Sequence, residues 1–199
     1  MPAIINLPIN ALAATYSIPA SDPDAGSTLT FGLPNLVSGP LAGQTEPTGF
    51  SINSSGLISM NTVGKTVGQL YNALVTVTDN NGNQIMLDFI IQMVGASNPP
   101  VFDYTTTPTN GTVFNVIAGQ NLSFPIKASD VDAGSTVKIT ASGLPSYITT
   151  TNFTPNLPVT ANPVTTTFSW TPGAAQIGTT NVLNFIATDN VGVQTTTSV

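Results

Sequence analysis

The sequence predicts an all-β protein composed of two Greek-key β-sandwich domains in tandem. Apolar residues recur with a period of two in short runs, which indicates strands with one buried face. Turn-forming residues separate these runs at intervals of about 8–12 residues. The whole plan occurs twice within 199 residues. About seven short strands per copy are expected, as in β-sandwich domains.

The duplication is clearest in two pairs of segments. Residues 21–28 read SDPDAGST and residues 129–136 read SDVDAGST, a separation of 108. LVTVTDNNG (74–82) matches NFIATDNVG (184–192) at a separation of 110. We therefore expect two domains, residues 1–97 and 98–199, each long enough to bury a core. The second copy ends inside its last expected strand, which favours a longer parent chain.

The strongest strand signals lie near the end of each copy. In residues 70–79, alternate positions are apolar and share one face, and residues 83–95 continue the pattern after a DNNGN turn (79–83) that predicts a hairpin. The second copy places Leu183, Phe185 and Ala187 on the corresponding face. The boundary segment GASNPPVFDY (95–104) contains two consecutive prolines, which predict a short extended connector.

Composition excludes several function classes. The chain has no His and no Cys, so it cannot form Ser-His-Asp or Cys-His nucleophiles, and zinc lacks its usual ligands. Three basic residues and a net charge of -6 argue against nucleic-acid binding. No apolar run is long enough to span a membrane, and the N-terminal stretch lacks the basic residues of a secretory signal. We expect no enzyme activity; Glu46 has no acid/base partner in the sequence, and Trp170 is expected to pack rather than to form a sugar-binding platform.

Six of the nine acidic residues occupy three matched positions in the two copies. In each copy two aspartates follow one strand and a third ends a distant strand, and both strand ends can lie at the same pole of a sandwich. Gathered carboxylates repel one another unless a cation lies between them, and oxygen ligands suit calcium. The alternative is that each Asp only caps its own turn through the neighbouring backbone.

These motifs resemble cadherin repeats. ASDPDAGST is similar to the A-x-D-x-D pattern at the end of a cadherin strand, VTVTDNNG and FIATDNVG resemble its later A-x-D-x-G segment, and NPPVF (98–102) resembles the end of its linker. GFSINSSGLISM (49–60) and residues 166–192 resemble the "putative Ig", dystroglycan-type cadherin-like repeats of large bacterial surface adhesins.

The resemblance implies metal ligands at seven positions. In the second copy, an inter-domain calcium would be held by Asp130, Asp132 and Asp189, together with Asn98 from the linker. The equivalent ligands in the first copy would be Asp22, Asp24 and Asp79. The linker's acidic positions are occupied by Val94 and Ser97, and the family's L-D-R-E motif is missing. The resemblance therefore implies one ion, or a weak site, at each junction instead of three ions.

The expected function is that of an extracellular adhesion and structural module within a cell-surface stalk. Its partners would be neighbouring repeats of the same protein, together with surface glycans or other cells. One alternative is a subunit of a virion surface or filament. Another is a carbohydrate-binding module of a secreted protein, against which the core-like positions of most aromatic residues argue.

Overall fold

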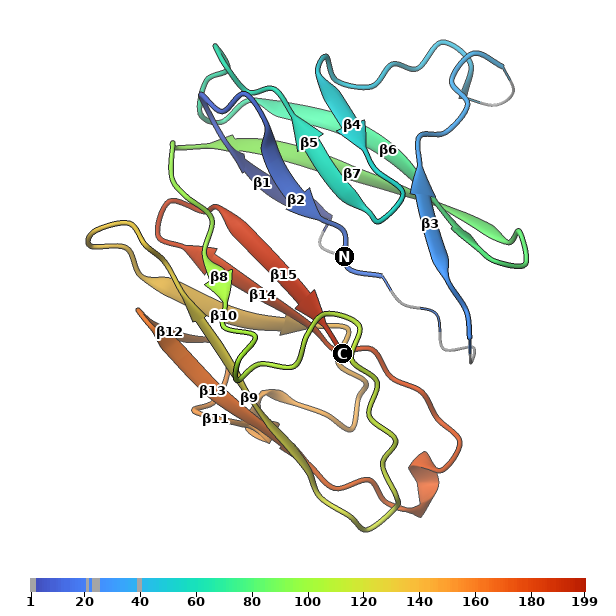
Figure 1. The fold of residues 1–199 in the computed structure, drawn as a ribbon, viewed down its shortest axis with the longest axis vertical. Coiled ribbons are helices and arrows are strands. Elements are labelled where there is room, and N and C mark those ends of the chain that lie inside the picture. Colours follow the sequence, from blue (N-terminus) through green and yellow to red (C-terminus); the bar gives the residue numbers. More distant parts are fainter. Residues whose placement is uncertain (1–2, 21, 23–25, 39–40) are drawn as a thin grey trace. The chain divides into compact units, whose positions relative to one another are not determined.

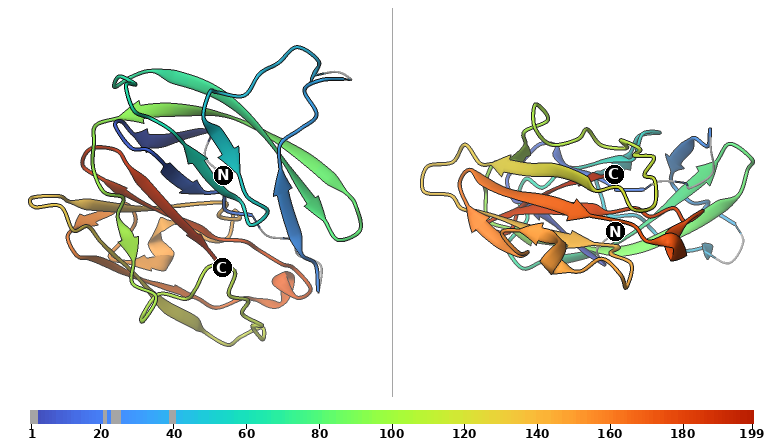
Figure 2. Two further views of the ribbon diagram at one scale, coloured as in Figure 1. Left: turned by 45° about the horizontal axis from the view of Figure 1, so that its top comes forward. Right: turned by 90° about the horizontal axis from the view of Figure 1, so that it is seen from below.

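The computed structural model describes residues 3–20, 22, 26–38 and 41–199. It forms two compact units, Met1–Ser97 and Asn98–Val199. Strands dominate both of them, as the arrows in Figures 1 and 2 show. The all-β prediction is confirmed. In the described ranges, no helix has the length and apolar character needed to cross a lipid bilayer.

Two sheets form the first unit. The larger has the order β1 (Ile4–Pro8), β7 (Gln84–Val94), β6 (Leu70–Asp79) and β3 (Leu29–Gly32), and the smaller has the order β2 (Ala14–Ser17), β5 (Leu57–Met60) and β4 (Phe50–Ile52). The β6–β7 hairpin is the one that the DNNGN turn predicted. β1 pairs with β7 in parallel, which the sequence pattern did not reveal. Pro8 is tolerated because β1 lies at the sheet edge, where a missing N–H breaks no ladder.

The core of the first unit lies between these sheets. The alternating faces of β6 and β7 are buried as expected, with Val75 and Ile91 fully covered, and the smaller sheet contributes Ile58 and Met60. Ile85 departs from the expected pattern because it lies next to the hairpin turn and is 62% exposed. Figure 1 shows that this hairpin extends beyond the short strands β4 and β5.

The second unit also contains two sheets, and each of them has four strands. One has the order β12 (Val159–Ala161), β10 (Val137–Ser142), β14 (Asn184–Asp189) and β15 (Gln194–Ser198). The other has the order β11 (Phe153–Thr154), β13 (Val164–Trp170), β9 (Leu122–Ser129) and β8 (Val101–Phe102). The pairs within both sheets are antiparallel. Residues just after the Pro-Pro sequence thus form β8 and pair with β9, so they belong to the second unit.

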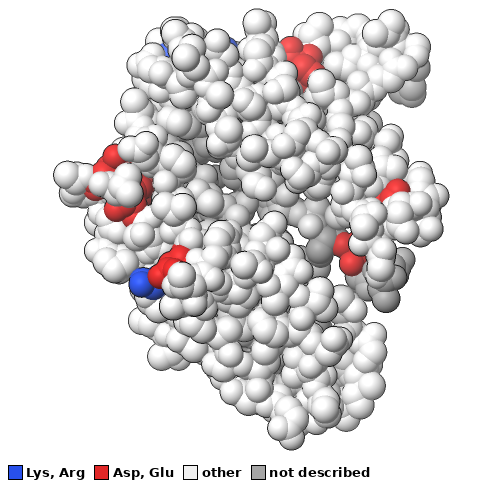
Figure 3. Space-filling model, viewed as in Figure 1, with Lys and Arg blue, Asp and Glu red and all other residues white. Residues whose placement is uncertain are grey.

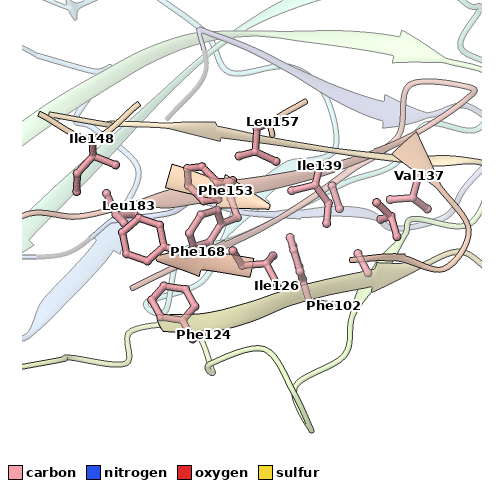
Figure 4. Packing of buried hydrophobic residues seen from close by; sticks show 14 residues of the cluster. Phe102, Phe124, Ile126, Val137, Ile139, Ile148, Phe153, Leu157, Phe168 and Leu183 are labelled. Atoms are coloured by element: carbon pink, nitrogen blue, oxygen red, sulfur yellow. The ribbon is translucent and has the colours of Figure 1, made fainter. Parts of the chain in front are cut away.

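Aromatic side chains fill the second core. Phe168 packs against Phe124 and Phe153 with ring centroids 5.1 Å and 5.2 Å apart (Figure 4). Phe185 meets Phe153 edge-on. Offset and edge-on arrangements are the favourable geometries for aromatic rings. Around them, Ile126 and Ile139 are fully buried. This core fixes the two sheets and therefore the ends of their strands.

The strand ends that carry the repeated aspartates come together at one pole of each unit. In the second unit, Val137 at the start of β10 pairs with Asp189 at the end of β14, and the loop before β10 begins at Asp130. In the first unit, Leu29 at the start of β3 pairs with Asp79 at the end of β6. The Ser-Thr pair that ends each copy of DAGST is held beside the asparagine of the later TDN sequence: Ser27 and Thr28 contact Asn80, and Ser135 and Thr136 contact Asn190.

Candidate functional site

The turn after β9 explains the spacing of the repeated sequence. The Asp132 N–H donates to Asp130 Oδ1 at 2.8 Å, and the Ser135 N–H donates to the Asp132 carbonyl at 3.0 Å. Gly134 has φ of 78°, a left-handed conformation that glycine adopts without steric cost. The D-x-D-x-G pattern thus codes for a tight turn in which the first carboxylate accepts from the backbone of the second aspartate.

Two asparagines brace this turn. The Asn162 Nδ2 group donates to the carbonyls of Asp130 and Ser135, and its Oδ1 accepts from the Asp130 N–H at 3.0 Å. Asn190 Oδ1 accepts from the Ser135 hydroxyl at 2.8 Å and from the Thr136 N–H. Sequence reasoning missed both residues. The repeated TDN sequence was the available signal for Asn190, whereas nothing in the sequence marks Asn162.

Asp189 is held by the backbone of its own turn. Its Oδ1 atom accepts from the N–H groups of Val191, Gly192 and Val193 at 2.9, 2.6 and 2.8 Å. This part of the arrangement is the Asx-type turn that the alternative interpretation predicts. The turn uses one of the two carboxylate oxygens.

The second carboxylate oxygens of Asp130 and Asp189 are buried, and neither has a hydrogen-bond partner among the described residues. The residues are only 8% and 6% exposed. A buried polar atom without a partner costs about 1–3 kcal/mol, and more when it is charged. Turn capping does not account for these two oxygens, because it leaves both of them unsatisfied.

Asp132 faces the start of the unit. Its Oδ2 and Oδ1 atoms accept from the backbone N–H and side-chain Nδ2 of Asn98, both at 2.8 Å. The structure therefore brings together Asn98 and Asp132, two of the residues expected at one metal site, as direct partners of each other. Thr195 holds the same segment by donating from its hydroxyl to the Pro100 carbonyl.

In the first unit, the two described equivalents, Asp79 and Asp22, accept hydrogen bonds within the unit. Asp79 Oδ1 accepts from the N–H groups of Asn81 and Asn83, and Asp79 Oδ2 accepts from the Asn83 side chain at 2.7 Å. These bonds, the one from the Asn83 side chain first, lower the pKa of Asp79. Asp22 Oδ2 accepts from the Ser27 hydroxyl at 2.7 Å. Asp24 lies outside the described residues.

One residue accounts for the different hydrogen bonding of Asp79 and Asp189. Asn83 corresponds to Val193 at the separation of 110, because Thr78 pairs with Gln84 and Thr188 pairs with Gln194. The Asn83 amide satisfies Asp79 Oδ2, and a valine side chain has no donor with which to satisfy Asp189 Oδ2. The two poles share a turn but differ in their electrostatics.

Within the ranges that the structure describes, no three side chains of the types His, Cys, Asp and Glu form a group able to hold a metal ion. Calcium also accepts backbone carbonyl and Asn oxygens, so two carboxylates can form part of a site. The chemistry of the orphaned oxygens at Asp130 and Asp189 fits a hard cation. Figure 3 shows how few charged groups the molecule carries on the face drawn.

The remaining candidates have structural explanations. Both carboxylate oxygens of Glu46 lie 3.3 Å from the Leu74 N–H, so this acid caps a backbone donor of β6. Burial raises its pKa. The indole of Trp170 is half-buried and stacks on Tyr147, with ring centroids 5.9 Å apart. It packs against the core, as expected.

Comparisons with known proteins agree with the fold. Residues 9–94 match the family model described as "Putative Ig domain". The match covers most of the first unit and supports the Ig-like resemblance that the sequence shows there. A match to a domain of this kind is consistent with the expectation that the chain is not an enzyme.

Two curated relatives extend the match. Integrin beta-like protein A of Dictyostelium discoideum is 29% identical over 91% of this chain, and integrin beta-like protein C of the same organism is 26% identical over 84%. The chain spans about a tenth of the length of each. The similarity thus includes both units but only a small part of each relative.

Cadherin ectodomains are among the similar solved structures. Drosophila N-cadherin EC1-4 is 17% identical, with a TM-score of 0.34, and matches all of this chain and 47% of its own. Protocadherin gammaB7 EC3-6 is 13% identical with the same TM-score, and 45% of that chain is covered. These values are low, and the fold assignment rests on the sheets themselves.

Proposed function

We propose that the chain is an extracellular adhesion-type structural module in which calcium binds at the pole of the second unit. The observation that carries this proposal is the pair of buried carboxylate oxygens, on Asp130 and Asp189, that have no partner in the part of the chain that the structure describes. A cation between them would replace the water that each oxygen loses on burial.

The ligands would come from fixed elements. Asp130 and Asp189 would each keep one oxygen in its turn and direct the other to the ion. Backbone carbonyl and water oxygens would complete the coordination that calcium requires. Asp132 and Asn98 would join them if their mutual hydrogen bonds were exchanged for the ion. When bound, the ion supplies charge neutralisation and a cross-link between strand ends.

The predicted calcium ligands of the two units differ in their hydrogen bonding. Asp79 has both oxygens satisfied by its hairpin, which favours a turn-capping role in the first unit. Asp22 and Asp24 stay predictions. With two buried carboxylates, the second unit's site would have the modest affinity of extracellular calcium modules, about 10⁻⁴–10⁻³ M. Such a site fills outside cells and empties inside them.

The adhesion role is supported by the relatives and by the repeat itself. Both curated relatives are named as integrin beta-like proteins, and their similarity extends through both units. We propose that the repeats act as spacers in a cell-surface stalk, with neighbouring repeats as their first partners. Calcium at the start of the second unit would stiffen the connection at Asn98. Glycans or other cells would be contacted elsewhere in the protein.

Calorimetric titration with calcium tests the metal site. The wild-type chain should bind calcium in the submillimolar to millimolar range. Asp189→Asn keeps the Oδ1 acceptor for three N–H groups but replaces the orphaned oxygen with an amide, so calcium binding should be lost with the fold intact. Asp88→Asn, on the exposed side of β7, is the matched control and should bind like wild type. Absence of binding to the wild-type chain would leave turn capping as the function of these aspartates.

A further inference from the structure

The turns that contain Asp79 and Asp189 share their backbone hydrogen bonds. In the first unit the Asp79 N–H donates to the Asn83 carbonyl at 3.0 Å, and Asp79 Oδ1 accepts from the Asn83 N–H at 2.7 Å. In the second unit the Asp189 N–H donates to the Val193 carbonyl at 3.0 Å, and Asp189 Oδ1 accepts from the Val193 N–H at 2.8 Å. A further bond in each turn joins a glycine N–H to the aspartate carbonyl. The backbone therefore places residues 83 and 193 in the same way relative to the aspartate.

The side chain at this position, which we call the closing position (residue 83 or 193), sets what the second carboxylate oxygen contacts. Asn83 donates from Nδ2 to Asp79 Oδ2 at 2.7 Å. This bond is the largest cause of the lowered pKa of Asp79, because it favours the charged carboxylate. The Val193 side chain contains only carbon atoms and has no donor, and Asp189 Oδ2 has no partner among the described residues.

The two closing positions also differ in their access to water. Asn83 is exposed and Asp79 is half-buried, whereas Val193 is 1% exposed and Asp189 is 6% exposed. A carboxylate oxygen that loses water on burial needs either a hydrogen-bond donor or a cation in its place. Because the closing position of the second unit supplies no donor, Asp189 Oδ2 can still accept a cation, as can the buried Asp130 Oδ2.

We propose that the closing position determines the specificity of each pole: an apolar side chain leaves the aspartate oxygen to a divalent cation, and a donor side chain replaces the cation. The inference rests on the calcium site of the proposed function and adds a residue that selects the partner without being a ligand. An amide at residue 193 would place its partial positive charge against Asp189 Oδ2, as Asn83 does at Asp79 Oδ2. A calcium-binding pole therefore requires the absence of a competing donor as well as the presence of carboxylates.

Calcium titration of two matched variants of the complete chain tests the proposal. Val193→Asn and Val193→Asp introduce side chains of nearly equal size, so both variants lose the same packing of the valine. The asparagine supplies a donor to Asp189 Oδ2 and should weaken calcium binding roughly tenfold or more. The aspartate supplies a further carboxylate and should strengthen binding, because calcium affinity depends on the number of charged ligands. Calorimetric titration with calcium chloride measures both affinities.

Val131→Asn is the control for these variants. Val131 is 76% exposed and lies next to Asp130, so the same substitution there adds an amide at this pole without a donor to the buried oxygen of Asp189. It should bind calcium like the wild-type chain. Equal calcium affinity of Val193→Asn and the wild-type chain, or of Val193→Asn and Val193→Asp, would overturn the inference and leave the proposed function in place. A wild-type chain that binds no calcium would overturn both.

A variant in the first unit keeps the test decisive if substitutions at the buried Val193 prevent folding. Asn83→Asp lies at an exposed position and replaces the donor at Asp79 Oδ2 with a second carboxylate. Two carboxylates in contact repel each other unless a cation lies between them. The melting temperature of the first unit should therefore rise between chelator and millimolar calcium by more than it does in the wild-type chain. Because each variant is compared with itself, the cost of the substitution cancels. A response no larger than that of the wild-type chain would overturn the proposal.

Discussion

At the residue scale, the two poles show how one side chain can decide whether the second oxygen of a turn-capping aspartate has a hydrogen-bond partner. Both copies make the same Ser–Asn contact, Ser27 with Asn80 and Ser135 with Asn190. They differ at Asn83 and Val193. The positions of the described aspartates at strand ends could be predicted from the sequence, because the period-two pattern shows where each strand ends and the repeat places the aspartates there. The sequence did not predict which carboxylate would lack a partner, because that depends on contacts across the turn.

A second residue-scale feature concerns pH. Burial raises the pKa of Glu46 above its ordinary value, and the hydrogen bond from Leu74 offsets this only in part. Between the ordinary and the raised pKa, the folded state binds the proton more tightly than the unfolded chain does. The first unit should therefore lose stability as pH rises through this interval. The lowered pKa of Asp79 acts only at lower pH, so it does not obscure the effect.

Glu46→Gln should flatten this pH dependence. The amide has no ionisation to couple to folding, so denaturant melts of the first unit between pH 4 and 7 should lose the slope assigned to Glu46. Because Glu46 is only partly buried, solvent screening keeps the effect small. Asp88→Asn serves as the control and should retain the wild-type slope. An unchanged slope in Glu46→Gln would show that its burial does not influence folding.

At the element scale, the β4–β5 hairpin depends on a glycine next to an aromatic ring. Gly56 has φ of 84°, and a Cβ atom there would lie 3.0 Å from the Phe31 ring. Gly64 has φ of 77° but has nothing within 4 Å of the same position. Alanine at either site pays the cost of a left-handed conformation, about 1 kcal/mol. Only at Gly56 does a packing conflict add to it.

Gly56→Ala should therefore destabilise the first unit more than Gly64→Ala does. The difference should be about 1 kcal/mol or more, since overpacking usually costs about 1–3 kcal/mol. Chemical denaturation of the two variants measures it directly. Equal losses would mean that Phe31 moves aside freely and that the turn conformation alone sets the cost.

The elements also show the limit of period-based prediction. Alternation identified β6 and β7 and their buried faces, because a strand packed on one side requires it. The parallel pairing of β1 could not be seen, because a strand's periodicity carries no information about its partner.

At the scale of the whole molecule, the chain contains one sequence pattern twice, and the two copies differ in the side-chain contacts at their poles. Each unit has its own core and its own pole, and the two sets of buried residues come from separate parts of the sequence, with a division between Ser97 and Asn98. We therefore expect separate unfolding transitions for the two units. Their response to calcium should differ, because only the second unit's pole leaves carboxylate oxygens unsatisfied among the described residues.

The most direct test of the calcium proposal is thermal unfolding of the full chain in millimolar calcium and in chelator. A ligand at about 100 times its dissociation constant adds roughly 2.7 kcal/mol to a folded state, and a tenfold excess adds about half of that. For a unit of about 100 residues this raises the melting temperature by several degrees. The account predicts this shift in the second unit's transition, its loss in Asp189→Asn and its retention in Asp88→Asn. Identical melting with and without calcium in the wild-type chain would contradict it.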